Sequence, residues 1–516
     1  MLTMFNFDLS LTTFVGAAVC FGILVLHPIW SRRKSKLPPG PRRLPIIGNA
    51  HQIPAEFPWM TFSDWSRKYG DIMHVDAMGQ SFVIVSSPKI AQDLLDKRSS
   101  VYSDRPHFVM ANELVGYGES FVLQPYGDNW RRQRRLVAQD FAQSNTPRYY
   151  SLQEREARIL VRNIMDTPSS LVSQIKLRIG MIIIRVTYGY SIRSEDDALL
   201  ATSLKAVENF SILMMPGNFL VDLIPPLKYL PRWLPGTRFF KTAEEMRKIL
   251  LDGAYIPYNW CKTNLETGKT LMPNLCATII QEAGGELPPD TQEKLIWAAG
   301  SVMGGGLDTN ISAALTFYLA MILNPAIQTK AQAELDNVVG KDRLPEIADR
   351  PNLPYVKAII AEIFRSGPSL PLGIPHVVSQ DDVYEGYSIP KGSVIMPNIW
   401  HMLHDPEVYP NPNEFNPDRF NGSDVEMEKV KDLVFGFGRR VCPGRYFAEA
   451  TLFAIVATTL ATCNVLPGHD ADGKKVLPEF AYSSGAIIIP KPFTLRLRPR
   501  SEQAAALLAD VPSAFE

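Results

Sequence analysis

The distribution of apolar and polar positions along the chain predicts three helices that bear on its function. Residues 289–323 form a long, mostly apolar run that begins with a proline and stops before Asn324-Pro325, as one continuous helix would. A second helix is expected over residues 355–365, and a third begins at Arg445. The longest of these helices is apolar enough to belong to the core of the protein.

The N-terminal segment has the length and composition of a membrane anchor. Residues 9–26 carry no charged side chain and would span about 27 Å as a helix, close to the roughly 30 Å thickness of a bilayer core. Asp8 precedes the segment and basic residues follow it (Arg32, Arg33, Lys34 and Lys36), which places the remainder in the cytosol. A cleaved signal peptide is the alternative, but no Lys or Arg precedes the apolar segment. We therefore expect an uncleaved anchor within residues 1–30, followed by a stiff proline-rich hinge at residues 37–41.

Composition and charge limit the classes of function. The chain has 516 residues, of which 46% are hydrophobic, so it can bury a large core. Lys and Arg (53) balance Asp and Glu (53), and the net charge of zero excludes a bulk attraction to nucleic acid. Five cysteines are too few for a disulfide framework and indicate a reducing compartment. The chemistry must therefore come from particular motifs.

One cysteine stands in a sequence suited to holding a metal. Cys442 lies in the stretch FGFGRRVCPG of residues 435–444. A thiolate is an electron-donating ligand, and haem iron held by Cys is biased toward cleaving the O–O bond. Gly438 and Gly444 allow a flat ring to approach the backbone closely, and the start of the following helix favours an anionic sulfur. Arg440 can donate a charge-assisted hydrogen bond to a haem propionate. The other cysteines are expected to be small buried apolar residues (Cys20, Cys261, Cys276 and Cys463).

The spacing F-x-x-G-x-R-x-C-x-G resembles the haem-binding signature of the cytochrome P-450 superfamily. The resemblance implies a mainly α fold with small β-sheets, preceded by one N-terminal transmembrane helix. It also implies haem b, held by Cys442 as the axial iron ligand, with Phe435, Arg440 and Gly444 as further cofactor-binding residues.

The same resemblance extends over most of the chain. It implies one catalytic domain over residues 31–500 and leaves residues 501–516 as a mobile tail. It further implies a single-pass protein of the endoplasmic reticulum membrane with a cytosolic catalytic domain. The implied partners are NADPH-cytochrome P-450 reductase, with cytochrome b5 as a second electron donor, and a lipophilic substrate.

Two further motifs resemble the parts of the family that contact the haem propionates. Trp130 and Arg134 share one face of a predicted helix and match the family's W-x-x-x-R; a solvated basic helix is the alternative. Arg131 and Arg135 form a second pair that points elsewhere and suits a docking surface. His376 occupies a position where the family places a basic side chain, so we expect a propionate partner rather than an acid–base catalyst.

Three consecutive glycines, Gly304–Gly306, interrupt the long predicted helix. Each costs about 1 kcal/mol relative to alanine, so the three require a reason. Close packing against another helix is one reason, and a flat cofactor lying against a locally opened helix is the other. Asp308 and Thr309 complete a sequence similar to the family's oxygen-activation motif, in which an acid and a hydroxyl relay protons. Asn310 departs from the Thr or Ser often found at the next position.

Glu362 and Arg365 share one face of a predicted helix. Exposed pairs of this kind contribute little to stability. Farther along, the sequence NPDRF of residues 416–420 is similar to the family's P-E-R-F. The resemblance therefore implies a buried network of Glu362, Arg365 and Arg419 that fixes the loop carrying Cys442, which is a structural role.

The segments that the resemblance places around the substrate are mainly apolar (residues 108–123, 210–223, 301–309, 370–375 and 483–488). A lipophilic substrate is therefore expected, and the apolar stretch 219–235 either dips into the membrane or packs in the core. Residues 371–376 and 400–412 look like those of fungal P-450s of secondary metabolism, such as the O-methylsterigmatocystin oxidoreductase group. This indicates a terpenoid, polyketide or aromatic substrate, or a xenobiotic.

Three functions remain open at this point. A monooxygenase takes electrons from NADPH through a reductase and uses Asp308 and Thr309 to deliver protons. A haem-thiolate isomerase or dehydratase needs neither reductase nor relay, and the Asp308-Thr309 pair argues against it. A membrane haem sensor would not require the glycine-rich helix.

Overall fold

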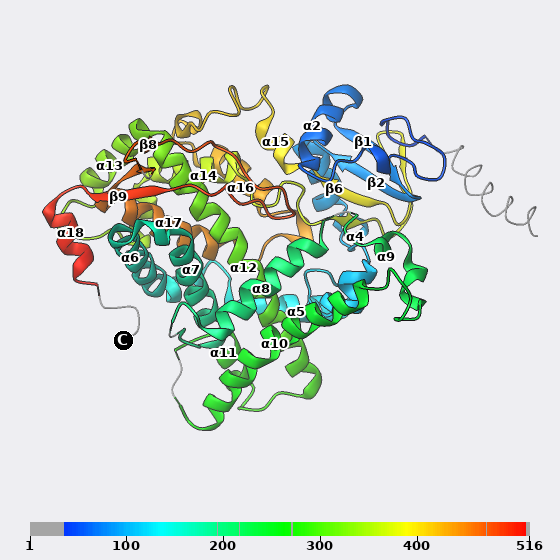
Figure 1. The fold of residues 1–516 in the computed structure, drawn as a ribbon, viewed down its shortest axis with the longest axis horizontal. Helices are drawn as coiled ribbons and strands as arrows, with labels where there is room; N and C mark the ends of the chain where they lie inside the picture. The colour runs from blue at the N-terminus through cyan, green and yellow to red at the C-terminus, as the bar shows by residue number, and fades with distance from the viewer. Residues whose placement is uncertain (1–35, 193, 216, 270–271, 471, 512–516) are drawn as a thin grey trace, which may run out of the picture.

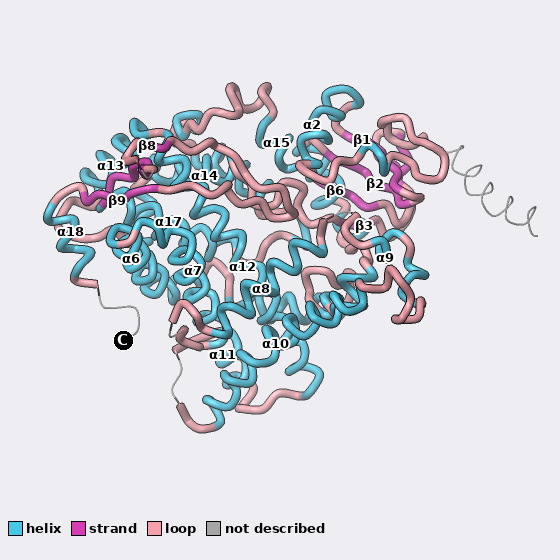
Figure 2. The backbone as a smooth tube through the Cα atoms, viewed as in Figure 1, coloured by secondary structure: helices cyan, strands magenta, loops and turns pink. Residues whose placement is uncertain are grey.

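Helices account for most of the protein, and the strands form small sheets near its edges (Figures 1 and 2). The fold is given by a computed structural model, which describes residues 36–192, 194–215, 217–269, 272–470 and 472–511. The expected fold class, mainly α with small β-sheets, is confirmed for these residues. The anchor predicted within residues 1–30 lies outside them.

The longer helices are α2 (Pro58–Tyr69), α5 (Asp128–Asp140), α6 (Tyr150–Asp166), α7 (Leu171–Tyr188), α8 (Ala198–Leu213), α10 (Phe239–Glu266), α12 (Pro289–Leu323), α13 (Pro325–Val338), α14 (Pro354–Ser366), α16 (Asp424–Val434) and α17 (Arg445–Thr462). The shorter helices are α3 (Pro88–Ala91), α4 (Ser99–Tyr102), α9 (Leu220–Leu223), α11 (Leu275–Glu282), α15 (Ile399–His404) and α18 (Glu502–Ala509). Short 3-10 or π turns include η4 (Val109–Val115), η5 (Tyr117–Glu119), η8 (Pro225–Tyr229), η10 (Pro417–Phe420) and η11 (Gly438–Arg440). The strands are β1 (Ile72–Ala77), β2 (Gln80–Val85), β3 (His376–Val377), β4 (Asp382–Tyr384), β5 (Tyr387–Ile389), β6 (Val394–Pro397), β7 (Cys463–His469), β8 (Lys475–Val476) and β9 (Leu495–Pro499).

The largest sheet joins two segments of the chain that are far apart in sequence, residues 72–85 and 376–397. It has four strands in the order β1-β2-β6-β3. β1 and β2 form an antiparallel hairpin, and β6 pairs with β2 in parallel, with Phe82 opposite Val394. β3 then pairs with β6 in the antiparallel sense, with His376 opposite Ile395. This pairing holds His376 in a buried position.

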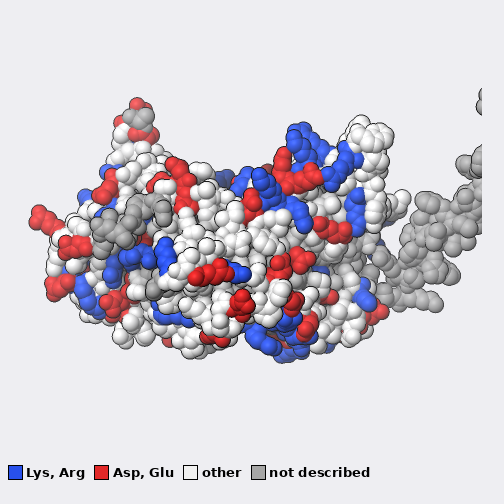
Figure 3. Space-filling view, turned by 90° about the horizontal axis from the view of Figure 1, so that it is seen from below, with Lys and Arg blue, Asp and Glu red and all other residues white. Residues whose placement is uncertain are grey.

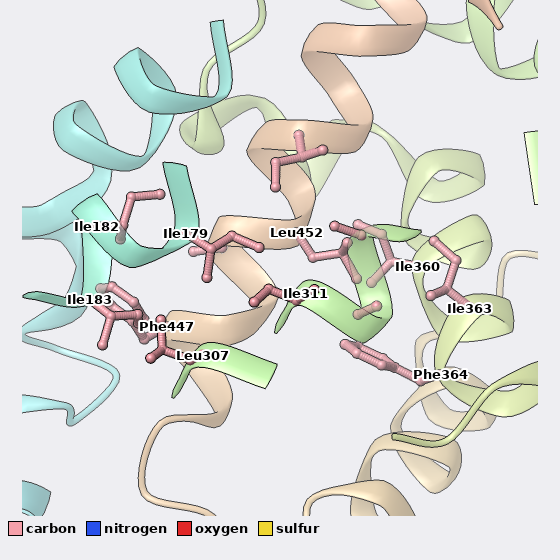
Figure 4. Close-up of a cluster of buried hydrophobic side chains, with 14 of the residues drawn as sticks. Ile179, Ile182, Ile183, Leu307, Ile311, Ile360, Ile363, Phe364, Phe447 and Leu452 are labelled. Atoms are coloured by element: carbon pink, nitrogen blue, oxygen red, sulfur yellow. The ribbon is translucent and has the colours of Figure 1, made fainter. Parts of the chain in front are cut away.

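Helix α12 lies in the core, and its bounds agree with the helix predicted over residues 289–323. Isoleucine, leucine and phenylalanine side chains from α7, α14 and α17 surround it (Figure 4). In the described part of the chain, α12 is the one helix long and apolar enough to cross a bilayer, and most of it is buried inside the protein. The helices predicted over residues 355–365 and from Arg445 are also present, as α14 and α17.

The two ends of the catalytic domain are more tightly packed than the sequence indicated. In the expected hinge, Pro38 is buried and the Pro39 carbonyl accepts a hydrogen bond from the His74 N–H at 2.8 Å, so this segment packs on β1. The expectation of a mobile tail is wrong for its first part. Residues 502–509 form α18, which Ser501 caps and whose Leu508 side chain is fully buried.

A buried carboxylate links α14 to the chain segment that follows it. Glu362 is inaccessible to solvent and accepts two hydrogen bonds of 2.8 Å from the Arg365 guanidinium. It also accepts one from Arg419 at 3.1 Å and one from the Asn416 N–H at 2.9 Å. Arg365 in turn donates to the Leu403 carbonyl at 2.9 Å. The structure thus brings the three residues together and ties residues 403–419 to α14.

We expect Glu362→Gln to lower the free energy of unfolding by about 3–5 kcal/mol, because it leaves two buried guanidinium groups without their counter-charge. Urea denaturation followed by circular dichroism measures this change. Asp64→Asn is the matched control, because it removes an exposed Asp64–Arg67 pair and should cost less than about 1 kcal/mol. Equal effects of the two substitutions would contradict a stabilising role for the network.

Candidate active site

A largely apolar cavity of about 330 Å³ lies between α12 and the segment that carries Cys442. Its walls come from α5, α8, α10 and α12, from residues 369–376, and from residues 434–448. Three of the five expected substrate segments contribute several lining residues each (108–123, 301–309 and 370–375). The other two contribute one each, Phe210 and Ile487. The sequence did not indicate the contribution of α10, whose Leu250, Gly253 and Ala254 line the cavity.

The loop that presents Cys442 is held by its own backbone and by close contacts. The Cys442 N–H donates to the Phe435 carbonyl at 2.7 Å, and the Phe435 ring meets Phe364 of α14 edge-on at 5.4 Å. Gly438 has a φ of +52°, and a Cβ there would lie 2.3 Å from the Leu95 carbonyl oxygen. Glycine is therefore required at this position both by conformation and by space.

The thiol of Cys442 lies in an apolar setting with positive groups nearby. Burial raises the pKa of this thiol overall, and the backbone N–H of Gly444 and the charges of Arg134 and Arg445 offset part of that increase. Gly444 precedes the first residue of α17, so the helix presents its N-terminal end to the sulfur. These groups stabilise a thiolate, the form in which cysteine binds a metal.

Basic side chains gather on one side of the cavity. Arg440 is buried and donates to the carbonyls of Ser103 (2.8 Å), Phe121 (3.0 Å) and Gln124 (2.6 Å). Its guanidinium lies 4.7 Å from the centre of the Trp130 ring, whose buried Nε1–H has no hydrogen-bond partner among the described residues. Burial lowers the pKa of Arg440 to about 10, so it keeps its charge at neutral pH.

Arg134 and His376 also line the cavity. Arg134 donates to the carbonyl of Val441, next to Cys442. The His376 Nδ1 lies 2.7 Å from the Tyr102 carbonyl oxygen and must carry the proton, because a carbonyl only accepts. Burial and the charges of Arg105 and Arg440 hold the pKa of His376 well below its usual range, so the ring is neutral and its Nε2 is an acceptor.

Arg105 is a cavity residue that the sequence did not reveal. It is buried and donates to the carbonyls of Val122 (3.1 Å), Ile374 (2.7 Å) and Pro375 (2.8 Å). Burial and the charge of Arg440 hold its pKa well below its usual range. No motif marks this arginine, and a buried arginine cannot be told from an exposed one by residue type alone.

The three glycines of α12 have different roles. A Cβ at Gly306 would lie 2.8 Å from the Ile183 side chain, so this glycine allows α7 to pack closely. At Gly305 nothing lies within 4 Å of the added Cβ, and this position faces the cavity. The helix remains continuous, so the local opening considered from the sequence is not seen. Instead the carbonyls of Gly305 and Gly306 accept hydrogen bonds from Thr309 (2.8 Å) and Asn310 (2.7 Å).

Only one of the two residues expected to relay protons lies on the cavity wall. Thr309 lines the cavity, whereas Asp308 is not among the lining residues. Burial raises the pKa of Asp308 to about 6, Lys176 lowers it, and Glu208 adds to the increase. Asp308 therefore gains and loses its proton close to physiological pH, and it is the neighbour in sequence of the cavity residue Thr309.

Comparisons with known proteins agree with this geometry. The family described as Cytochrome P-450 matches residues 38–497. Cytochrome P-450 monooxygenase 105 of Postia placenta is 50% identical over 503 residues, covering 97% of this chain and 96% of the relative. Cytochrome P-450 monooxygenase claR of Ampulloclitocybe clavipes is 39% identical over 496 residues, covering 95% and 92%. The chain therefore belongs to the cytochrome P-450 family and is a monooxygenase, with fungal relatives as its sequence predicted.

The family implies a haem, and the residues around the cavity fit one. Cys442 supplies a thiol, and open space beside Gly305 leaves room for a flat ring. Arg105, Arg134 and Arg440 lie on the wall, and within the described part of the chain no carboxylate forms an ion pair with any of them. Buried cations need counter-charges, which two propionates would supply. A propionate oxygen could also accept from the buried Trp130 Nε1–H, which has no partner among the described residues.

The raised pKa of Asp308 gives a stability prediction with a defined sign. Between about pH 4 and pH 6 the folded state holds this proton while the unfolded state has released it, so this group's contribution to stability falls as pH rises. We expect Asp308→Asn to raise the free energy of unfolding at pH 8 by about 1–2 kcal/mol, allowing for partial exposure. The gain should shrink toward pH 5.

Thermal unfolding of the holoenzyme between pH 5 and pH 8 measures this effect. Asp290→Asn is the control of opposite sign, because Lys294 lowers the pKa of Asp290 and the substitution should destabilise the protein at pH 8. A gain from Asp308→Asn that did not vary with pH would contradict the assignment.

Proposed function

We propose that this monooxygenase oxidises a lipophilic small molecule, a fungal secondary metabolite or a xenobiotic, with O₂ and with electrons from NADPH. The observation that supports this most is the combination of a largely apolar cavity with one thiol and a rim of buried cations. When bound, the haem supplies the chemistry that activates O₂. The substrate would fill the apolar space bounded by α8, α10 and α12, which excludes water from the reacting carbon.

The proposed roles of the chain's own groups follow from their positions. Cys442 would hold the iron, the charges of Arg105, Arg134 and Arg440 would neutralise the propionates, and the Trp130 Nε1–H would donate to one of them. His376, expected from the sequence to be a propionate partner, is neutral with its proton donated to the Tyr102 carbonyl, so it has no proton left to donate to a carboxylate. Thr309 holds a proton at its hydroxyl, which now donates to the Gly305 carbonyl. Asp308 exchanges protons with solvent near neutral pH and passes them along through water. A haem-thiolate isomerase would need neither group.

Electron supply is proposed to come through the face that carries the Cys442 loop. Arg131 and Arg439 are exposed there, with their guanidiniums 5.5 and 4.8 Å from the centre of the Tyr126 ring. Arg135 is exposed on the same helix as Arg131. These charges suit an acidic docking face on NADPH-cytochrome P-450 reductase or cytochrome b5. On the face drawn in Figure 3, by contrast, positive and negative side chains are interspersed.

Membrane attachment is proposed to use the anchor and a second contact. In the stretch 219–235, Val221 is buried, whereas Leu220, Tyr229 and Trp233 are 63%, 79% and 80% exposed. The stretch thus divides between core packing and an exposed apolar surface, and α9 lies toward the same end of the molecule as the start of the described chain (Figure 1).

We expect a form lacking residues 1–30 to float with lipid vesicles, and the double substitution Leu220→Ser and Trp233→Ser to abolish the flotation. Flotation unchanged by the two substitutions would reject the contact.

We expect Cys442→Ala to abolish both product formation and the absorption band of the reduced, carbon-monoxide-bound protein that is characteristic of thiolate ligation. The reason is that alanine cannot bind the iron, while the folding core is unaffected. Cys463→Ala is the matched control, because Cys463 is buried in β7, away from the cavity, and should leave the band in place. Retention of the band in Cys442→Ala would overturn the site.

We expect Thr309→Ala to keep haem, substrate binding and NADPH consumption, while product falls and hydrogen peroxide rises. Positioned proton delivery contributes about 10²–10⁴-fold to a rate, which bounds the loss. NADPH, product and peroxide are measured together. Thr316→Ala is the control, because Thr316 lies on the same helix but outside the cavity wall. Wild-type product yield without extra peroxide in Thr309→Ala would reject proton delivery by this hydroxyl.

A further inference from the structure

Two buried serine hydroxyls face each other on the wall of the cavity. Ser301 lies on α12 and Ser120 follows η5, and their Oγ atoms are 2.7 Å apart. The residues are 8% and 6% exposed, and both line the cavity. The lining residues next to them in sequence are apolar (Phe121, Val122, Val302 and Met303). The pair is thus a polar spot in an apolar stretch of wall.

The hydrogen bonds of this pair determine what it can recognise. The Ser301 Oγ lies 2.7 Å from the Trp297 carbonyl oxygen, and because a carbonyl only accepts, the Ser301 proton is used there. Ser120 then donates its proton to the Ser301 Oγ. Both hydroxyl protons are committed, and lone pairs remain on both oxygen atoms. The pair can therefore accept a hydrogen bond from a ligand but cannot donate one without rearranging.

We propose that the Ser120–Ser301 pair is a binding subsite for a hydroxyl group of the substrate. This deepens the proposed function and rests on it, because it defines the lipophilic substrate as an alcohol. A hydroxyl buried elsewhere in an apolar wall would lose its hydrogen bonds to water without compensation. At this pair it finds an acceptor, whereas a ketone oxygen would face only other acceptors.

The position of the pair also sets the length of the substrate. Ser301 precedes Thr309 by about 12 Å along the axis of α12, at 1.5 Å per residue. A hydroxyl at Ser301 and a reacting carbon near Thr309 then lie on the order of 10 Å apart. That distance matches a tri- or tetracyclic skeleton or an extended chain of comparable length.

Matched probes that differ only in oxygen chemistry test this subsite. Binding to the holoenzyme is measured by calorimetry and by the change in haem absorption, with androstan-3-ol, androstan-3-one and androstane, and with dodecan-1-ol, dodecan-2-one and dodecane. We expect the alcohol of at least one set to bind about three- to tenfold more tightly than its ketone and hydrocarbon, the range of one neutral hydrogen bond.

Substitutions then separate recognition from a structural role. In Ser301→Ala the Ser120 hydroxyl loses its acceptor and becomes free to donate, so the alcohol preference should fall and the ketone should gain relative to the hydrocarbon. In Ser120→Ala the Ser301 oxygen remains an acceptor, so the alcohol preference should fall only in part, and the ketone should not gain because the Ser301 proton stays donated to the Trp297 carbonyl. Ser312→Ala is the matched control, because this buried serine of α12 donates to the Ile488 carbonyl at 2.7 Å outside the cavity wall.

An alcohol preference absent in the wild type in both sets, or unchanged in both variants, would overturn the subsite and leave the pair as a link between η5 and α12. The reduced, carbon-monoxide-bound spectrum is recorded for every sample. If that spectrum lacks the thiolate band in the wild type, the proposed function fails. If the band is present and the alcohol preference is absent, only the subsite fails.

Discussion

The position of the candidate active site depends on a carboxylate that water cannot reach. Glu362 accepts hydrogen bonds from two guanidiniums and a backbone N–H, and loss of its charge would leave both buried guanidiniums without a counter-charge. Arg365 lies on α14 beside it, whereas Asn416 and Arg419 lie on the chain between α15 and α16, which leads into the Cys442 loop. Burial of ionised groups is costly, so this arrangement is stable only when all of the segments are in place together. The network therefore couples the packing of α14 to the geometry around the thiol.

The buried arginines of the cavity, unlike Glu362, have no side chain of opposite charge bonded to them among the described residues. Arg105, Arg134 and Arg440 are desolvated and bonded to backbone carbonyls, with no ion-pair partner among the described residues. Desolvation lowers the pKa of both Arg105 and Arg440, the charge of Arg440 lowers that of Arg105 further, and the charge of Arg134 lowers that of Arg440. The nearby Asp104 carboxylate offsets part of this. An anionic cofactor would reduce both the cost of desolvating these arginines and the repulsion between them, so its binding would stabilise the folded state. The unfavourable electrostatic energy of the buried arginines in the absence of a cofactor therefore favours the binding of the propionates.

The substrate side of the cavity has few polar groups, and the hydrogen bonds that they donate are defined. Thr309 and Asn310 donate to carbonyls of their own helix, and Ser301 donates to Trp297. The hydroxyl protons of Thr309 and Ser301 are therefore committed to carbonyls of α12, and their oxygen atoms keep lone pairs that can accept. Water would find few donors there, which keeps the site dry for an apolar substrate while leaving acceptors for a hydroxyl group.

Local sequence alone determined the features that short-range physics controls. A proline start and an Asn-Pro stop fixed the bounds of α12, and the fixed spacing around Cys442 identified the loop and the helix that begins at Arg445. Tertiary structure decided which side chains meet. Arg105 is held at the cavity by the carbonyls of Ile374 and Pro375, 269 and 270 residues away in sequence, and Asp308 lies outside the cavity wall although Thr309 lines it. Such placements depend on contacts between segments hundreds of residues apart, which no local pattern encodes.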